Sequence, residues 1–213
     1  LDEAIKDARN IIKLKPALIR IFDEDESLRY FGRDKFSMIV IFEGIDAAEK
    51  VKYAKEVISG VIVEGYAEKW LEKRFDVSEI SKIVPLGFIF DTIEVACFWS
   101  SAEKLYKEVI KAIRSVEGTV MVSAHASHFY ESGLCFYFTF VGLPSDIESY
   151  YKEVWRRALE ASLKSGGNVT HHHGIGRLRK NWLPVEIGNY YQLLKDVKVI
   201  LDRRNIMNPG GMI

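Results

Sequence analysis

The stretch LCFYFTFV, from Leu134 to Val141, combines aromatic and β-branched residues and is largely apolar at odd and even positions alike. Residues of these types favour strands, and a strand that is apolar on both faces is expected inside a sheet that is covered on both sides. We therefore predict a central strand here. Similar runs predict further strands at residues 37–42, 61–64 and 119–124, whereas the apolar stretch 85–99 is ambiguous.

Five other segments repeat apolar residues every three or four positions, which is typical of amphipathic helices. They cover residues 1–14, 46–59, a segment after Ser100, 145–165 and 185–202. The third begins with Ser-Ser-Ala-Glu, which fits a capping box, and Gly166-Gly167 is expected to end the fourth. Strands and helices alternate irregularly, and no glycine-rich phosphate loop follows a strand. The pattern predicts an α+β fold and argues against a dinucleotide-binding fold.

The composition is that of an ordinary globular protein. The 213 residues are 48% hydrophobic, and 30 basic side chains balance 30 acidic ones, so no net charge draws the chain to nucleic acid. Because no linker or internal repeat divides the chain, one domain is the simpler interpretation. Cys97 and Cys135 do not resemble a secreted disulfide framework, and no run of about 18 apolar residues suggests a transmembrane helix. We expect a cytoplasmic protein.

Three consecutive histidines, His171, His172 and His173, precede the flexible sequence Gly174-Ile175-Gly176. Imidazole changes its charge near neutral pH, so clustered histidines suit proton transfer or metal binding. From spacing alone, a solvated loop is an equally open interpretation. The basic stretch that follows, from Arg177 to Leu183, is on the same grounds more often a solvated turn than an anion site.

The whole run His171–Leu183, HHHGIGRLRKNWL, closely resembles the alkyldihydroxyacetonephosphate synthases, which are FAD enzymes of the vanillyl-alcohol-oxidase type. The wider group of FAD-linked oxidases and D-lactate or glycolate dehydrogenases carries GEHGIG there instead. The end of the chain, Asp202–Gly210, resembles the Asn-Pro-Gly terminus of that wider group. Near the start, Pro16–Asp23 resembles a family motif of the form P-A-x-I-R-L-x-D, and Phe42–Gly44 and Glu94–Trp99 align more weakly.

The resemblance implies that residues 1–213 form a single cap domain that binds substrate, built on a mostly antiparallel sheet flanked by helices. The FAD-binding domain is not in this sequence, so an FAD-binding domain or subunit is the expected partner and FAD the expected cofactor. The family exchanges the acyl group of acyl-dihydroxyacetone phosphate for a long-chain alcohol. A homodimer and a peripheral contact with a membrane are further interactions that the resemblance leaves open.

By the same resemblance, His171, His172 and His173 supply the acid–base chemistry. The synthases carry a catalytic tyrosine at the start of an aromatic strand motif, and Cys135 stands in that column here. Tyr137 lies two residues further along and would share the same face of the strand, so we include it as the candidate catalytic tyrosine.

Arg20 and Arg74 fall where the family has arginines near the substrate, and Arg177 follows the histidine motif. The planar guanidinium can bond two oxygens of a phosphate or a carboxylate. From the residues alone, Arg20 and Arg74 would more often be surface ion-pair residues. Asn208, in the Asn-Pro-Gly end, is expected on the cofactor side.

Two other functions remain open. An FAD-linked dehydrogenase for a 2-hydroxy acid would use the same cap, with an arginine holding the carboxylate. Some members of that branch bind a divalent metal, and the matching positions here are His128, Cys135 and His172, all of which are suitable zinc ligands. The alternative is that His128 and Cys135 are ordinary strand residues. A non-enzymatic cap module that awaits a separate flavin subunit is the third possibility.

Overall fold

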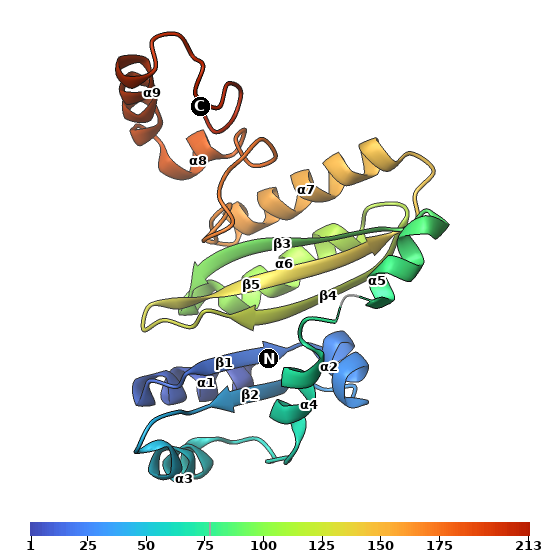
Figure 1. The fold of residues 1–213 in the computed structure, drawn as a ribbon, viewed down its shortest axis with the longest axis vertical. Coiled ribbons are helices and arrows are strands. Elements are labelled where there is room, and N and C mark those ends of the chain that lie inside the picture. The colour runs from blue at the N-terminus through green and yellow to red at the C-terminus, as the bar shows by residue number, and fades with distance from the viewer. Residues whose placement is uncertain (77) are drawn as a thin grey trace.

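The computed structural model describes residues 1–76 and 78–213, without the side chains of residues 79 and 80. Its centre is a five-stranded antiparallel sheet with the order β2-β1-β4-β5-β3 (Figure 1). The expected α+β fold, with a mostly antiparallel sheet flanked by helices, is confirmed. The strands are β1 Leu18–Phe22, β2 Ser37–Ile41, β3 Ile89–Phe98, β4 Thr119–Ser127 and β5 Gly133–Gly142.

Helices cover one face of the sheet along its length and part of the other face at the β1–β2 end (Figure 1). The α-helices are α1 Asp2–Ile11, α2 Glu24–Phe31, α3 Ala47–Val57, α4 Tyr66–Lys73, α5 Ser78–Ile83, α6 Ala102–Arg114, α7 Ile147–Lys164, α8 Leu183–Ile187 and α9 Tyr190–Leu201. Short 3-10 turns lie at η1 Ile12–Leu14, η2 Val84–Leu86 and η3 Trp99–Ser101.

The predicted central strand is confirmed as β5, which lies between β4 and β3. Its even-numbered side chains, from Leu134 to Phe140, are buried in the main core, where they meet apolar residues of α6 and α7. Its odd-numbered side chains, Cys135, Tyr137 and Thr139, lie on the opposite face. We call this second surface the site face, because the polar groups described below gather on it.

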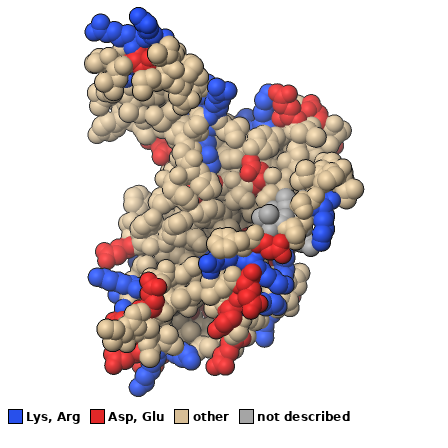
Figure 2. Space-filling view, in the orientation of Figure 1, with Lys and Arg blue, Asp and Glu red and all other residues tan. Residues whose placement is uncertain are grey.

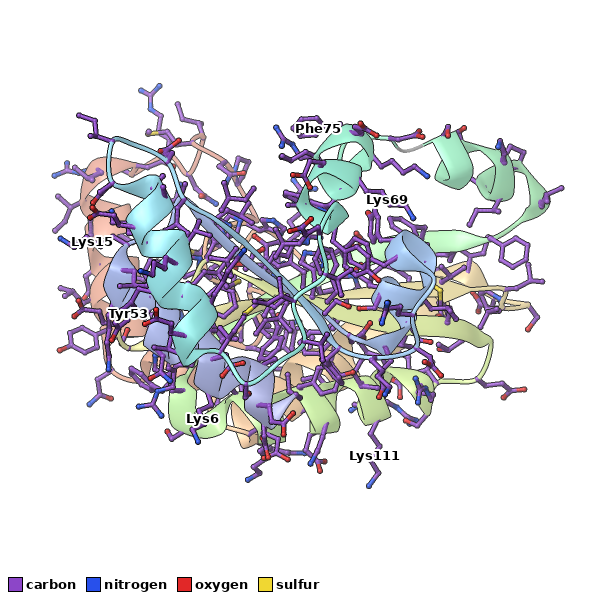
Figure 3. All side chains as sticks on the ribbon, turned by 90° about the horizontal axis from the view of Figure 1, so that it is seen from below. Lys6, Lys15, Tyr53, Lys69, Phe75 and Lys111 are labelled. Atoms are coloured by element: carbon purple, nitrogen blue, oxygen red, sulfur yellow. The ribbon has the colours of Figure 1, made fainter. Side chains whose placement is uncertain are left out.

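A smaller aromatic cluster covers the site face at the β1–β2 end. Phe22 and Ile39 from the sheet pack there against Phe31 of α2 and Trp70 of α4. Figure 3 shows α4 from below, with Phe75 at its outer edge, where this side chain is 81% exposed. This aromatic cluster therefore leaves the β3–β5 half of the site face uncovered, and the polar residues described below lie there.

Asp23 ties β1, α2 and β4 together at this end of the sheet. Its Oδ1 accepts a hydrogen bond from the Glu26 N–H at 2.9 Å and so caps α2. Its Oδ2 accepts from the backbone N–H of Ala124 and from the hydroxyl of Tyr106, the latter at 3.4 Å. The buried carboxylate of Asp23 thus fixes the first turn of α2 beside β4.

Several local predictions were wrong. Residues 61–63 form no strand, because this apolar run lies along a surface loop instead of pairing with a neighbouring strand. The expected capping box fails as well: α6 begins at Ala102 after η3, and the side chain of its N-cap Ser101 makes no capping bond. The last predicted helix is two helices, since the chain turns at Gly188 with a positive φ of 55°.

The C-terminal part, α8 and α9, stands away from the sheet (Figure 1). None of the described side chains of α9 is buried, and Leu193, Ile200 and Leu201 are all more than half exposed. No helix in the described part of the chain is both long enough and apolar enough to cross a bilayer.

The role of Asp23 predicts that Asp23→Ala lowers the free energy of unfolding by roughly 2–4 kcal/mol, since two buried N–H groups lose their acceptor along with the helix cap. Urea unfolding followed by circular dichroism measures this. Asp146→Ala is the matched control, because Asp146 caps α7 through Ser149 at the exposed surface. Its loss should stay near 1 kcal/mol. Equal losses in both variants would contradict the role assigned to Asp23.

Candidate functional site

All five histidines of the chain gather around Tyr137 on the site face. They come from β4, from the residue directly after it, and from the loop after α7, and are His125, His128, His171, His172 and His173. We call this group the histidine cluster. Figure 2 shows that lysine, arginine and carboxylate side chains gather mainly toward the two ends of this view of the molecule, and that other residues make up most of the surface between them.

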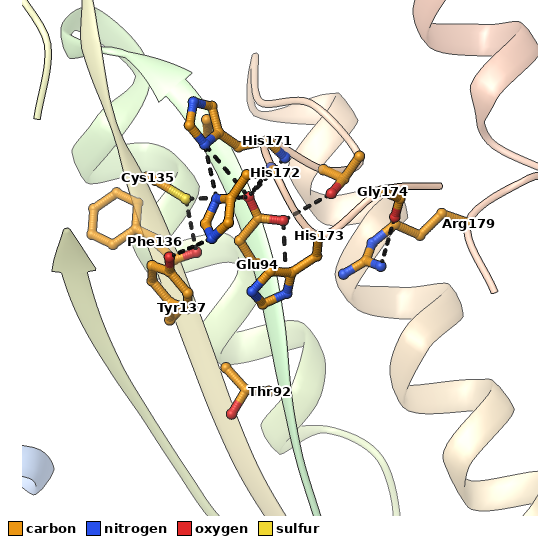
Figure 4. Close-up of polar contacts among 12 residues, drawn as sticks. Thr92, Glu94, Cys135, Phe136, Tyr137, His171, His172, His173, Gly174 and Arg179 are labelled. Carbon is orange, nitrogen blue, oxygen red and sulfur yellow. Dashed lines mark hydrogen bonds and ion pairs between the residues drawn. The ribbon is translucent and has the colours of Figure 1, made fainter. Parts of the chain in front are cut away.

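The carboxylate of Glu94 anchors the loop that carries three of these histidines (Figure 4). Glu94 lies on β3 with no exposed surface. Its Oε1 accepts hydrogen bonds from the backbone N–H groups of His171, at 2.8 Å, and His172, at 2.9 Å. Its Oε2 accepts from the hydroxyl of Thr170 at 2.8 Å, and the Cys135 thiol lies 3.5 Å from Oε1. The loop therefore has to lie across β3 and β5.

Glu94 is held in its ionised form. Burial alone would raise the pKa of its carboxyl, but the hydrogen bonds from Thr170 and from the backbone of His172 and His171 outweigh burial and leave the pKa below its ordinary value. A carboxylate accepts and cannot donate, so each group that faces it must bring its own proton. This requirement bears on which nitrogen of the neighbouring His172 ring carries the proton.

Tyr137, His172 and Glu94 form a connected chain of polar contacts. The Nδ1 of His172 lies 3.1 Å from Glu94 Oε1, and its Nε2 lies 3.0 Å from the Tyr137 hydroxyl. Nδ1 of His172 also lies 3.0 Å from Nδ1 of His171, and a proton on His172 Nδ1 suits both neighbours, because Glu94 can only accept. With the proton there, Nε2 accepts from Tyr137. A base held between a hydroxyl and an orienting carboxylate is the arrangement that proton transfer requires.

The pKa values of neighbouring groups fit such a relay. Burial raises the pKa of the Tyr137 phenol, with smaller contributions from Cys135 and Glu94, so the hydroxyl keeps its proton until a base removes it. Burial lowers the pKa of His173 and of His128, which favours neutral rings.

The two predicted substrate arginines meet at one indole ring. The guanidinium of Arg20 lies 5.3 Å from the centre of the Trp70 ring, and that of Arg74 lies 5.6 Å from it. Arg20 is largely buried on β1, and its Nη2 is 3.9 Å from Glu26 Oε2. Arg74 is exposed at the end of α4 and also lies over Phe75. The aromatic contacts direct both cations to the β1 side of the site face.

Two other predicted residues lie apart from this arrangement. Arg177 is exposed in a turn, whereas Arg179 of the same stretch is buried, lies over Trp155 and donates to the Gly174 carbonyl at 3.1 Å. Asn208 lies in the C-terminal turn with a left-handed φ of 49°, and only its backbone takes part there, accepting from the Gly211 N–H at 3.2 Å. Neither Arg177 nor Asn208 contacts the histidine cluster among the described residues.

The ligand set suggested for a metal differs from the one found. Cys135 and His172 do belong to a group whose ligand atoms all lie within 4.8 Å of one another, but the other members are Glu94 and His171, and His128 is not among them. His128 instead lies with its ring 4.6 Å from that of His172. An ion bound by this group would have to share Oε1 of Glu94 with the backbone N–H groups of His171 and His172.

Sequence reasoning missed Glu94, the residue that organises the site, as well as Glu26 and His125. One signal was present: Glu94 is one of two carboxylates, with Asp91, in the otherwise largely apolar stretch 85–99, and a buried charge needs several partners. No local pattern pairs His125 with Glu26, because they are 99 residues apart and meet only in the folded chain.

The chain was compared with known proteins. Residues 1–212 match the family described as FAD linked oxidases, C-terminal domain. An uncharacterized FAD-linked oxidoreductase, YgcU of Escherichia coli K12, is 26% identical over 92% of the chain and 46% of its own length. An alkyldihydroxyacetonephosphate synthase of Trypanosoma brucei brucei is 30% identical over 88% of the chain and 33% of its own length.

A D-lactate dehydrogenase of Archaeoglobus fulgidus is 21% identical over 92% of the chain and 43% of its length. A solved structure of an alkyldihydroxyacetonephosphate synthase superposes with a TM-score of 0.68 at 19% identity, over 98% of this chain and 42% of that one, and shows the shared fold. The chain thus spans less than half the length of these relatives.

The contacts of Glu94 predict that Glu94→Gln loosens the histidine loop. The glutamine carbonyl can still accept from the His171 and His172 amides, which share one oxygen of Glu94, but these hydrogen bonds lose their charged acceptor and become weaker, at a cost of roughly 1–3 kcal/mol. Urea unfolding and amide hydrogen exchange of these two residues measure the effect. Glu153→Gln, in a surface ion pair on α7, is the control and should cost no more than about 1 kcal/mol. Unchanged exchange in Glu94→Gln would refute the anchoring role.

The lowered pKa of Glu94 also predicts an acid-sensitive loop. The folded chain binds this proton more weakly than the unfolded chain, so the carboxylate contributes stability above the ordinary glutamate pKa of 4.5 and loses it as the pH falls through the lower folded value. Protection of the His171 and His172 amides should therefore decline below about pH 4. The same decline in Glu94→Gln would assign it to another group.

Proposed function

We propose that this chain, which belongs to the family of FAD linked oxidase C-terminal domains, is the substrate-binding part of an enzyme that exchanges the acyl group of acyl-dihydroxyacetone phosphate for an alkyl group. The observation that carries the proposal is the chain of contacts from the Tyr137 hydroxyl through His172 to Glu94. The reaction replaces a carbon–oxygen bond to a carboxylate with one to an alcohol. It needs a base next to the ketone, an acid for the departing carboxylate and a cationic site for the phosphate.

The described residues can fill each of these roles. His172 can take a proton through Nε2 while Glu94 stabilises the positive ring, and Tyr137 can give its proton and recover it from His172. His171, whose Nδ1 lies 3.0 Å from that of His172, and His173 complete the polar surroundings. Arg20 and Arg74 would bind the phosphate from the β1 side. The proton that the base takes from the carbon next to the ketone would leave with the carboxylate. The alcohol would then lose its proton to the freed base as its oxygen replaces the carboxylate, and that proton would return to the carbon.

The site face suits one side of a flavin but not the whole of FAD. The cluster offers half-exposed imidazoles and a phenol on a face that the described helices leave open at the β3–β5 end. The described residues show no strand followed by a glycine-rich turn and a helix, which a pyrophosphate would need. FAD, held mainly by another part of the protein, would supply an electron-accepting ring against this face.

A second candidate is oxidation of a 2-hydroxy acid. The D-lactate dehydrogenase and FAD-linked oxidoreductase relatives support it, and so does Cys135 in the column where the synthases carry their tyrosine. Arg20 or Arg74 would then hold the carboxylate of the acid, and His172 would remove the proton of its hydroxyl. A non-enzymatic cap, the third interpretation, gains no specific support from the site.

The proposal predicts acyl–alkyl exchange by the complete protein, which joins this chain to its FAD-binding part, with no net bleaching of the flavin. Tyr137→Phe and His172→Gln should each lower kcat roughly 10²- to 10⁴-fold by removing a proton-transfer group. Arg74→Ala should mainly raise KM. Exchange of labelled hexadecanol into acyl-dihydroxyacetone phosphate measures these effects.

Tyr151→Phe is the control for this experiment, because it removes a partly buried hydrogen bond to Asp91 outside the histidine cluster and should leave kcat unchanged. Bleaching of the flavin by D-lactate or another 2-hydroxy acid, without exchange, would replace the synthase proposal with the dehydrogenase. A protein inactive in both assays would leave the non-enzymatic cap.

A further inference from the structure

We propose that His125 and Glu26 form a positioning pair that holds the ring of Tyr137 in place and thereby maintains the hydrogen bond from Tyr137 to His172. The inference rests on the proposed function only in giving that hydrogen bond a role in proton transfer. Neither His125 nor Glu26 belongs to the histidine loop or to the pair of substrate arginines. Both are positioning residues, since neither needs to touch the substrate.

The first observation is the contact between His125 and Tyr137. The two residues are direct cross-strand partners in the β4–β5 ladder, so their side chains leave the sheet on the same face. Their rings are stacked, with centroids 4.7 Å apart and planes inclined by 14°. Among the rings that surround Tyr137, His128, His172 and His173 are tilted to it by 34° or more. Among these histidines, His125 is therefore the one whose ring stacks on the phenol ring.

The second observation is that His125 is itself held. Its Nδ1 lies 3.0 Å from Oε1 of Glu26, a residue of the first turn of α2 whose side chain is only 3% exposed. Asp23 binds the backbone N–H of Glu26 and also that of Ala124, the residue before His125. The backbone segments that carry the two partners are thus connected through one carboxylate, and the contact is built into the fold.

The third observation concerns charge. Glu26 faces Arg20 and Arg29, at 3.9 and 3.6 Å, and its pKa is lowered although burial opposes this, because these cations and the hydrogen bond from His125 favour its ionised form. Burial, aided by both arginines, lowers the pKa of His125 although Glu26 opposes this. Glu26 is therefore ionised and His125 neutral near pH 7, so Nδ1–H donates to Glu26. Burial raises the pKa of Asp23, beside Glu26, to about 7, and burial also raises the pKa of Tyr137, which keeps its phenol proton.

Two contacts therefore hold the Tyr137 side chain, one at its ring and one at its hydroxyl. The stack on His125 fixes the plane of the ring, and the hydroxyl can then meet Nε2 of His172 at 3.0 Å. Without a flat neighbour the phenol could rotate about its χ angles, and the hydroxyl would leave the line to His172. Positioning of this kind decides proton transfer, since the base must lie within hydrogen-bond reach.

Imidazole nitrogen NMR of the chain, labelled with ¹⁵N-histidine, tests the proposal. In the unmodified chain at pH 7 we expect His125 to carry its proton on Nδ1, a cross-peak between the rings of His125 and Tyr137, and a His172 Nε2 shift typical of an accepted hydrogen bond. Tyr137→Phe provides the His172 shift without that bond. His125→Leu and His125→Phe are a matched pair, because both lose the bond to Glu26 and only phenylalanine keeps a flat ring.

His125→Leu should move the His172 Nε2 shift more than halfway toward the Tyr137→Phe value, and His125→Phe less than halfway. Equal shifts in both variants, or an unchanged shift in His125→Leu, would overturn the proposal. If the variants do not fold, a proton on Nε2 of His125 or a missing ring cross-peak in the unmodified chain would overturn it. Because no turnover is measured, failure of acyl exchange in the complete protein would refute the proposed function and leave this result standing.

Discussion

The site depends on the carboxylate of Glu94, a charged group with no exposed surface in the middle of a strand. An unpartnered charge in that position would be too costly to keep, so the fold must bring donors to it. The loop after α7 supplies them through Thr170 and two backbone N–H groups. The buried charge thus decides where the loop lies, and the loop decides where the histidines lie.

A second buried acidic side chain, Asp23, fixes backbone segments at the other side of the site, although burial raises its pKa to about 7 and it is not held ionised as Glu94 is. Glu94 connects β3 to the histidine loop, and Asp23 connects α2 to β4. Tyr137 stands on β5 between these two connections, with His172 on one side and His125 on the other. His172 contacts Glu94 and His125 contacts Glu26. Both glutamates lie in segments that are fixed by their own backbone contacts. The phenol is therefore placed from both sides by groups distant in sequence.

Patterns that are local in sequence predicted their part of the fold. The aromatic run 134–141 and the long amphipathic segment 145–165 were recognisable because their periods extend over several residues, and both are confirmed as β5 and α7. Residues 61–64 are of strand-forming types but have no strand beside them to pair with, so strand propensity alone gave a wrong prediction there. Strand β1 and helix α2 are short, and tertiary contacts define them more than composition does.

The spacing of the strands bears on what the site face can bind. Arg20 lies on β1 and Tyr137 on β5, with β4 between them, and Phe22 rather than Arg20 is level with Tyr137. Two strand spacings across, about 10 Å, and two residues along the strand, about 7 Å, therefore place their backbones about 12 Å apart. Both side chains leave the same face, and the guanidinium at the end of a long side chain can shorten that separation. A compact substrate, with its anionic group only a few bonds from the reacting carbon, can therefore meet the arginine and the phenol together. In dihydroxyacetone phosphate and in 2-hydroxy acids the anionic group is only a few bonds from the reacting carbon. In a substrate with a larger separation, either the anionic group or the reacting carbon would lie outside the site face. Under the proposed function, the arginine side of the site would favour a short substrate head, and the candidate substrates would have to be distinguished at the histidine end.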